Sequence, residues 1–198
     1  MAPSAKIRMT ICALDELYRY SAQGVTHILS ILDPDVPEPD VFRTYQSHYR
    51  TTLRFHDDID PAPNLILPQI EHIETILAFG RSLADDTRAG GERYALVHCH
   101  MGISRSTAAM VTLLALVHPD EYEDKLFHRL LQLRPQAWPN CLMIGLADDL
   151  LGRQGRLISA LGRFYAVQLA NRPEIGPHMR RGGRGREVDM AACSELHR

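Results

Sequence analysis

One cysteine and one arginine, six positions apart, stand between an apolar strand and an apolar helix near the middle of the chain. Residues 94–98 have the short apolar run of a buried strand, and the residues from Ser106 onward are apolar on nearly all sides of a helix. Cys99 lies at the turn between the two. A buried strand followed at once by a buried helix predicts the repeating unit of an α/β fold.

The loop between Cys99 and Arg105 suits the binding of a phosphoryl group. Its backbone can wrap a tetrahedral dianion with the N–H groups pointing inward, and the free amides of the helix start complete the cradle. Gly102 permits a tight turn, and Arg105 offers a planar fork that matches two phosphoryl oxygens. The arginine charge and the helix dipole both favour the thiolate form of Cys99, which makes it a candidate nucleophile. The phosphate-binding residues are predicted to be His100, Met101, Gly102, Ile103, Ser104 and Arg105.

The nine residues from His98 to Ser106 resemble the Cys-x5-Arg-Ser/Thr signature of the protein tyrosine phosphatase superfamily. The loop is most similar to the dual-specificity-like branch, and especially to its small bacterial members. The resemblance covers roughly residues 6 to 170. It implies an α/β fold with a central, mainly parallel sheet of four to five strands flanked by helices. It also implies a hydrolase that forms a phosphocysteine intermediate, needs no cofactor and binds no metal.

A general acid must protonate the oxygen that leaves phosphorus. The resemblance implies an aspartate on a loop before the nucleophile, and residues 55–61 carry three aspartates directly after a predicted strand. Asp58 followed by Ile59 fits the register of relatives best, and Asp57 is the alternative acid. Asp60 precedes Pro61 and is interpreted as a turn residue.

Four further residues have supporting roles in this prediction. Ser106 matches the hydroxyl that hydrogen-bonds the cysteine sulfur in relatives, and it can also cap the helix. Asn140, after Pro139, either braces the phosphate loop, as in relatives, or only caps the helix that follows. His98 is predicted to support the loop by hydrogen bonding rather than to act as a base, and His100 to line the pocket.

Strand and helix patterns alternate along the rest of the chain, as an α/β sheet requires. Strands are predicted at residues 7–14, 26–32 and 51–56, and a proline-rich acidic loop at residues 33–40. Apolar residues at helical spacing predict helices at residues 15–21, 64–83, 120–134, 140–151 and 155–170. The later helices are expected to stack on one side of the sheet.

Composition limits the alternatives further. A chain of 198 residues with 45% hydrophobic residues can bury one substantial core, and a net charge of −2 predicts neither a nucleic-acid partner nor a membrane partner. The start lacks the apolar stretch of a signal peptide, and the four cysteines are scattered, so a cytoplasmic location is expected. The excess of arginine over lysine suggests a GC-rich bacterial source.

The end of the chain has a different character. Residues 1–172 are predicted to form a phosphatase catalytic domain, whereas residues 173–198 hold few large apolar side chains and many Arg and Gly residues. Such a segment buries too little surface to offset its ordering entropy, and we predict a disordered tail. The alternative is that its arginines dock an acidic partner or phosphates.

The predicted substrate is a phosphoprotein or a small phosphomonoester. Lipid phosphatases of the superfamily often carry lysines inside the loop, whereas this loop has only His100 before Arg105, so we expect phosphotyrosine and also consider phosphoserine and phosphothreonine. The alternatives are a phosphatase of non-protein phosphomonoesters, a phosphate-binding scaffold without turnover and a sulfurtransferase of the rhodanese kind. A metal site at His98, Cys99 and His100 is disfavoured because three consecutive residues do not converge on one ion.

Overall fold

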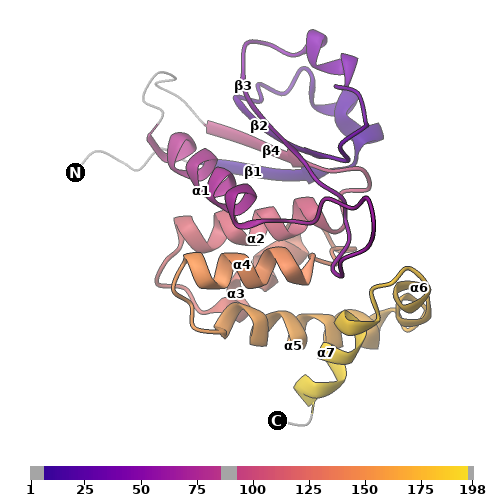
Figure 1. Cartoon of the computed structure of the whole chain (residues 1–198). Helices are drawn as coiled ribbons and strands as arrows, with labels where there is room; N and C mark the ends of the chain where they lie inside the picture. The colour runs from indigo at the N-terminus through magenta and orange to yellow at the C-terminus, as the bar shows by residue number, and fades with distance from the viewer. Residues whose placement is uncertain (1–6, 86–92, 196–198) are drawn as a thin grey trace.

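Four parallel strands form one sheet. The computed structural model describes residues 7–85 and 93–195. In these ranges the strands lie in the order β1 (Ile7–Cys12), β4 (Arg93–His98), β2 (His27–Leu32), β3 (Tyr49–Arg54) (Figure 1). Every neighbouring pair is parallel, so the carboxyl ends of all four strands meet at one edge. The predicted mainly parallel sheet of four to five strands is confirmed.

The sheet separates a small core from a large one. On one face, the short 3₁₀ helices η1 (Leu14–Tyr20) and η2 (Asp40–Thr44) place Leu17 and Phe42 against apolar residues of β2 and β4. On the other face, α1 (Ile70–Asp85) and α2 (Arg105–Val117) cover the strands. Because both faces are covered, β2 is buried at all six positions, as is typical of a parallel strand.

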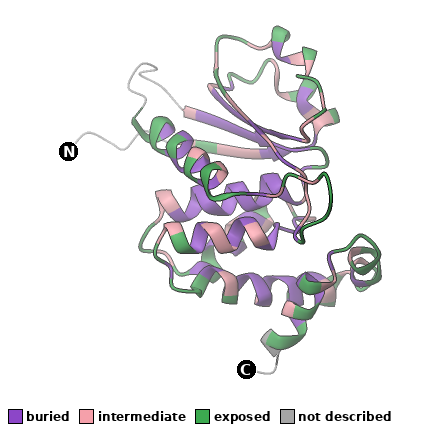
Figure 2. Ribbon diagram, in the orientation of Figure 1, coloured by how far each residue is buried: buried purple, intermediate pink, exposed green. Residues whose placement is uncertain are grey.

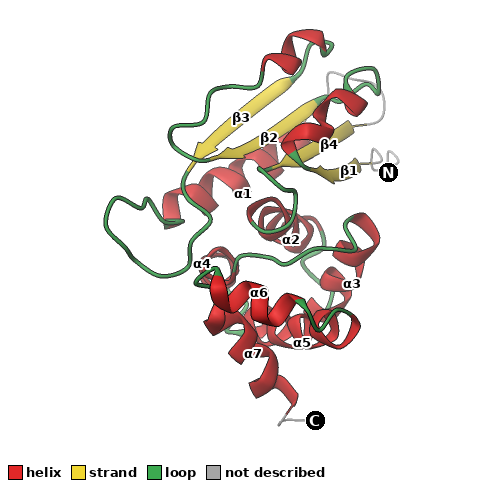
Figure 3. Cartoon of the chain, turned by 90° about the vertical axis from the view of Figure 1, so that its right-hand side faces the viewer, coloured by secondary structure: helices red, strands yellow, loops and turns green. Residues whose placement is uncertain are grey.

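The helices after α2 form further layers on the same side of the sheet, as predicted (Figures 1 and 3). These are α3 (Glu123–Leu133), α4 (Cys141–Leu150) and α5 (Arg156–Asn171). The helix α2 lies between the sheet and these layers and is buried over most of its length, as Figure 2 shows. None of the helices in residues 7–85 and 93–195 combines the length and the apolar character needed to cross a bilayer.

The start of α1 differs from the predicted helix at residues 64–83. The helix begins at Ile70. Asn64 has a φ of +64°, which is outside the right-handed helical region, and Pro68 disfavours helical backbone at the residue before it. Apolar residues between these positions continue the helical spacing, but the backbone of residues 64–69 is a loop.

The prediction that residues 173–198 are disordered is wrong for residues 175–195. They form α6 (Ile175–Arg181) and α7 (Gly185–Glu195), and α7 packs along α5 (Figures 1 and 3); residues 196–198 lie outside the described ranges. Val188 and Ala191 join the large core. From composition alone the arginines of this segment are expected to be solvated. Arg184 is instead buried between two carboxylates, that of Asp57 far away in sequence and that of Glu187 three positions on.

Candidate functional site

The loop from Cys99 to Ser104 joins the carboxyl end of β4 to the first turn of α2. This is the edge of a parallel sheet at which α/β proteins assemble their sites. The side chain of Cys99 is only 2% exposed, and its Sγ lies 3.1 Å from the Oγ of Ser106. The structure therefore contains the cysteine–serine contact that the resemblance implies.

Gly102 holds the loop tightly against β1. It has a φ of +66°, and a Cβ at this position would lie 2.7–2.8 Å from backbone atoms of Cys12 and Ala13. The loop is tied to the same segment by a hydrogen bond from the Leu14 N–H to the His100 carbonyl at 2.9 Å. Arg134 donates to the carbonyls of Met101 and Gly102 from outside. Gly102 thus shapes the loop from behind rather than lining the pocket.

Replacing Gly102 with alanine should destabilise the fold by about 2 kcal/mol or more and should also lower activity, because backbone atoms cannot move aside as a flexible side chain can. The matched control is Gly24→Ala, since Gly24 has a φ of +70° but no atom within 4 Å of the added Cβ. Denaturant unfolding followed by the fluorescence of Trp138, the only tryptophan, measures both variants. Equal destabilisation of the two variants would contradict a close approach at Gly102.

Arg105 is buried, and its guanidinium group contacts the residues that directly follow β2 and β3. One terminal nitrogen, Nη1, donates to Asp33 Oδ1 and to the Phe55 carbonyl, both at 2.5 Å. The Nε is buried and has no hydrogen-bond partner within the described residues. Buried polar groups are nearly always hydrogen-bonded in folded proteins, so this nitrogen is suited to an incoming phosphoryl oxygen.

Asp33 is a site residue that the sequence analysis missed. It was assigned to the proline-rich surface loop, but its carboxylate pairs with Arg105, whose side chain is 3% exposed. The available signal was its position directly after β2, at the same sheet edge as Cys99. We interpret Asp33 as a residue that fixes the orientation of the guanidinium group.

Asp57, and not Asp58, is the carboxylate that lines the pocket with Cys99 and Arg105. The register of relatives favoured Asp58, whose carbonyl instead accepts a hydrogen bond from Asn140 at 3.4 Å. The Oδ1 of Asp57 accepts from Ser104 Oγ at 2.7 Å, from Asn140 Nδ2 at 3.1 Å and from Arg184 Nη1 at 3.3 Å. These three donors direct Asp57 toward the phosphate loop. The sequence register of relatives, which favours Asp58, does not reveal these contacts.

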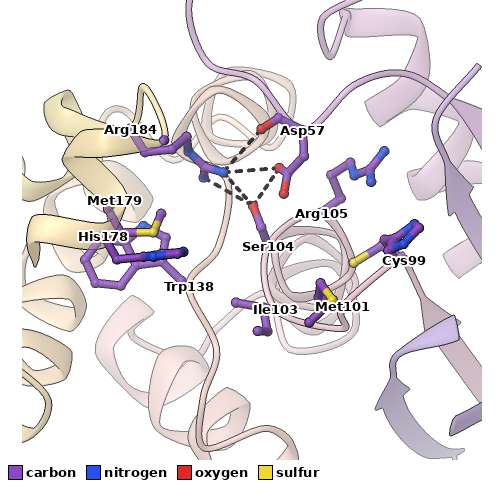
Figure 4. Close-up of a pocket in the computed structure, with 12 residues that line it drawn as sticks. Asp57, Cys99, Met101, Ile103, Ser104, Arg105, Trp138, His178, Met179 and Arg184 are labelled. Carbon is purple, nitrogen blue, oxygen red and sulfur yellow. Dashed lines mark hydrogen bonds and ion pairs between the residues drawn. The ribbon is translucent and has the colours of Figure 1, made fainter. Parts of the chain in front are cut away.

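The pocket has a volume of about 260 Å³ and two kinds of lining. One end holds Cys99 and Arg105, and the other holds Trp138, His178 and Met179. Figure 4 shows that the two ends face each other across Ser104 and Ile103. The lining residues are Asp57, Cys99, His100, Met101, Ile103, Ser104, Arg105, Trp138, His178, Met179, Gly182 and Arg184. The predicted phosphate-loop residues other than Gly102 therefore line it, and the segment expected to be disordered supplies four more.

Asn140 caps α4, as predicted, and it also contacts the loop of the aspartates. Its Oδ1 accepts from the Met143 N–H at 3.1 Å and so caps α4. Its Nδ2 donates to Asp57 and to the Asp58 carbonyl, which ties α4 to the loop of the aspartates. Its amide nitrogen thus braces the aspartate loop, where the resemblance implied the phosphate loop.

His98 is buried behind the phosphate loop and outside the pocket. Its Nε2 lies 2.7 Å from Ser30 Oγ on the neighbouring strand β2. Burial lowers the pKa of His98 from its ordinary value of 6.5 to about 4, so the ring is neutral at neutral pH. This environment fits a supporting residue.

The stability of the chain should fall in acid because of His98. The pKa is lower in the folded chain than in the unfolded chain, so protonation favours unfolding. The stabilisation is complete above pH 6.5 and is lost as the pH falls toward 4, which amounts to roughly 3 kcal/mol. Between pH 8 and pH 4, the unfolding free energy of the wild-type chain should fall by roughly 3 kcal/mol more than that of the His98→Gln variant. Urea titration at each pH measures both values. Parallel losses in both proteins would show that His98 is not a source of acid sensitivity.

Within the described ranges there is no cluster of three or more His, Cys, Asp and Glu side chains arranged to hold a metal ion.

Many solved structures are similar to this chain, among them Tk-PTP, human DUSP28 and PTPMT1, whereas no family model and no curated protein sequence matches it. Tk-PTP in the active form has 17% identity and a TM-score of 0.52, with 77% of this chain and 99% of that chain covered. Human DUSP28 has 22% identity and a TM-score of 0.53, with coverage of 77% and 94%. PTPMT1 in complex with PI(5)P has 12% identity and a TM-score of 0.51, with coverage of 74% and 91%. The chain thus has the fold of the dual-specificity and protein tyrosine phosphatases, as the resemblance predicted.

Proposed function

We propose that this chain is a cysteine-dependent phosphatase that hydrolyses phosphotyrosine, and also phosphoserine or phosphothreonine, through a phosphocysteine intermediate. The observation that carries the proposal is one pocket that joins three groups. They are the Cys99 sulfur beside Ser106, the Arg105 guanidinium with its unpaired Nε, and the Asp57 carboxylate. A nucleophile, a cation for the equatorial oxygens and an acid are what transfer of a phosphoryl group requires.

The first chemical step transfers the phosphoryl group to sulfur. The Cys99 thiolate attacks phosphorus while Arg105 and the loop amides hold the equatorial oxygens. The phosphorus–oxygen bond to the leaving group breaks, and the carboxylic acid of Asp57 gives its proton to that oxygen. All three hydrogen bonds to this side chain are on Oδ1, so Oδ2 is the oxygen assigned to the proton.

The second step releases phosphate. Asp57, now a carboxylate, takes a proton from water as the water oxygen attacks phosphorus and the phosphorus–sulfur bond breaks. Ser106 donates its hydroxyl hydrogen bond to the departing sulfur, consistent with the 3.1 Å separation. The products are the alcohol or phenol and inorganic phosphate, and the free enzyme is restored without an external cofactor.

The lining of the pocket supports an aryl phosphate as substrate. Around the phosphate site, the side chains of Met101, Ile103 and Met179 offer apolar surface to a phenyl ring. The loop has no lysine, and the other arginine that lines the pocket, Arg184, is already paired with Asp57 and Glu187. A second anionic group on the substrate would therefore find little unpaired positive charge at this end of the pocket.

The test is a substrate panel with the full chain. We expect hydrolysis of para-nitrophenyl phosphate and of a phosphotyrosine peptide, inhibition by vanadate, and no effect of EDTA. Phosphoserine and phosphothreonine peptides and vesicles with phosphatidylinositol 5-phosphate complete the panel, because PTPMT1 has been solved with PI(5)P. Greater activity on the vesicles than on the peptides would indicate that the substrate is a non-protein phosphomonoester. Thiocyanate formation from thiosulfate and cyanide without phosphatase activity would indicate a sulfurtransferase, and vanadate binding without turnover would indicate a scaffold.

A further inference from the structure

We propose that Arg184, in the C-terminal segment, is a positioning residue that sets the Asp57 carboxylate against the phosphate loop. This inference rests on the proposed function and assigns a role in it to a segment that lies outside the Cys-x5-Arg signature. The two arginines that carry the argument, Arg184 and Arg186, are called the arginine clasp below.

Arg184 bridges the two loops that the reaction brings together. Its Nη1 lies 3.3 Å from both Asp57 Oδ1 and the Asp57 carbonyl oxygen. Both terminal nitrogens lie 3.2 Å from Ser104 Oγ, and this hydroxyl in turn donates to Asp57 Oδ1 at 2.7 Å. Figure 4 shows this closed set of contacts at the mouth of the pocket. Arg184 therefore contacts both the acid and the phosphate loop, and it adds to the direct hydrogen bond that Ser104 donates to Asp57.

Glu187 holds that guanidinium group in place. Its side chain is fully buried and accepts from Arg184 Nε at 2.9 Å and from Nη2 at 2.6 Å. It also accepts from Trp138 Nε1 at 2.6 Å and from the Cys141 N–H at 2.9 Å, which anchors it to the start of α4. The two hydrogen bonds to the buried Glu187 carboxylate restrict the rotation of the planar Arg184 guanidinium group. Its remaining N–H donors are therefore held in fixed directions.

The charges around Arg184 are balanced. Burial alone would lower its pKa, but the carboxylates of Glu187 and Asp57 raise the pKa above its ordinary value, so the guanidinium remains charged. Because Arg184 already forms ion pairs with the carboxylates of Asp57 and Glu187, it is poorly suited to bind a second phosphate group. This pairing with two carboxylates favours a role of Arg184 in positioning Asp57 over direct binding of the substrate.

Arg186 contacts the loop of the aspartates at residues 59 and 60, beyond the point where Arg184 contacts Asp57. Its Nη2 donates to the Ile59 carbonyl at 2.7 Å, and its Nη1 lies 3.3 Å from the Asp60 carboxylate. The arginine clasp therefore contacts the loop of the aspartates at Asp57 and again at residues 59 and 60. A loop held at both places enters catalysis already near its working position, which lowers the entropy lost on reaching it.

The experiment compares two leaving groups in Arg184→Lys and Arg184→Met. Phenyl phosphate needs protonation of its leaving oxygen, whereas 2,4-dinitrophenyl phosphate expels a stable phenolate without an acid. We expect kcat on phenyl phosphate to fall about 30-fold or more in both variants and kcat on 2,4-dinitrophenyl phosphate to change less than about 3-fold. The ratio of the two kcat values does not depend on the fraction of folded protein, so it remains informative when a variant is unstable.

Two controls separate positioning from general support of the fold. Arg180→Met removes an exposed ion pair with Asp189 from the same segment and should leave both kcat values unchanged. In an Asp57→Asn background, Arg184→Lys should cause no further loss, because a residue that acts through Asp57 has nothing left to position.

Each outcome decides a different claim. An unchanged ratio in the Arg184 variants, or additive losses with Asp57→Asn, would overturn the role of Arg184 while leaving the phosphatase intact. Absence of hydrolysis of both substrates by the wild-type chain would instead overturn the proposed function.

Discussion

Replacing Cys99 with serine should lower kcat for aryl phosphates by about 10⁴-fold or more, because a serine hydroxyl is not ionised at neutral pH and is a far weaker nucleophile than a thiolate. The substitution changes one atom in a side chain that is 2% exposed, so the fold should persist. Steady-state hydrolysis of para-nitrophenyl phosphate measures the loss. Vanadate protection against unfolding, followed through Trp138, establishes that the variant is folded.

Cys193→Ser is the matched control for this variant. Cys193 lies in α7, is exposed and does not line the pocket, so its replacement should leave kcat unchanged. Substantial turnover by Cys99→Ser would place the nucleophile elsewhere. A loss of activity in Cys193→Ser equal to that in Cys99→Ser would show that the assay reports damage to the chain rather than chemistry.

Replacing Asp57 with asparagine should lower kcat on a phosphotyrosine peptide by about 10² to 10³-fold with little change in KM. An amide keeps the size of the side chain and can still accept the hydrogen bonds of Ser104 and Asn140, but it has no proton to give to the leaving oxygen. The same variant should keep most of its activity on 2,4-dinitrophenyl phosphate, whose phenolate leaves unassisted.

Asp58→Asn provides the comparison that separates the two aspartates. Asp58 lies next to Asp57 but does not line the pocket, so we expect kcat within about 3-fold of wild type. If Asp58→Asn were the variant with the large loss, the acid would be the residue that the sequence register favours, and Asp57 would be only a structural carboxylate.

Sequence patterns were sufficient wherever the decisive contacts are local. The strand β4, the loop from Cys99 to Arg105 and the helix α2 are consecutive in the chain, so apolar runs and a single motif define them. The contact between Cys99 and Ser106 also lies within this unit, and the resemblance implied it correctly. The parallel sheet follows from alternating strands and helices, since neighbouring parallel strands need a long connection.

The remaining parts of the site depend on contacts between residues far apart in sequence. The sequence could not predict the contacts of Asp57, the alternative acid, because its donors Ser104, Asn140 and Arg184 come from three other segments. Arg184 falls in the segment predicted to be disordered, because composition does not reveal that the distant Asp57 and the neighbouring Glu187 pair with it in the interior. Helices α6 and α7 are short, and the packing of α7 on α5 and of α6 on α7, rather than intrinsic propensity, accounts for them.

The most direct test of the central claim is detection of a phosphoryl group on Cys99 during turnover. The chain, with Ser106→Ala used to slow release of the sulfur, is mixed with an aryl phosphate, quenched in denaturant and digested for peptide mass analysis. The account predicts one phosphoryl group on the peptide that contains Cys99, lost when Cys99 is replaced by serine. A chain that turns over substrate while the phosphoryl group is found on another residue would contradict it.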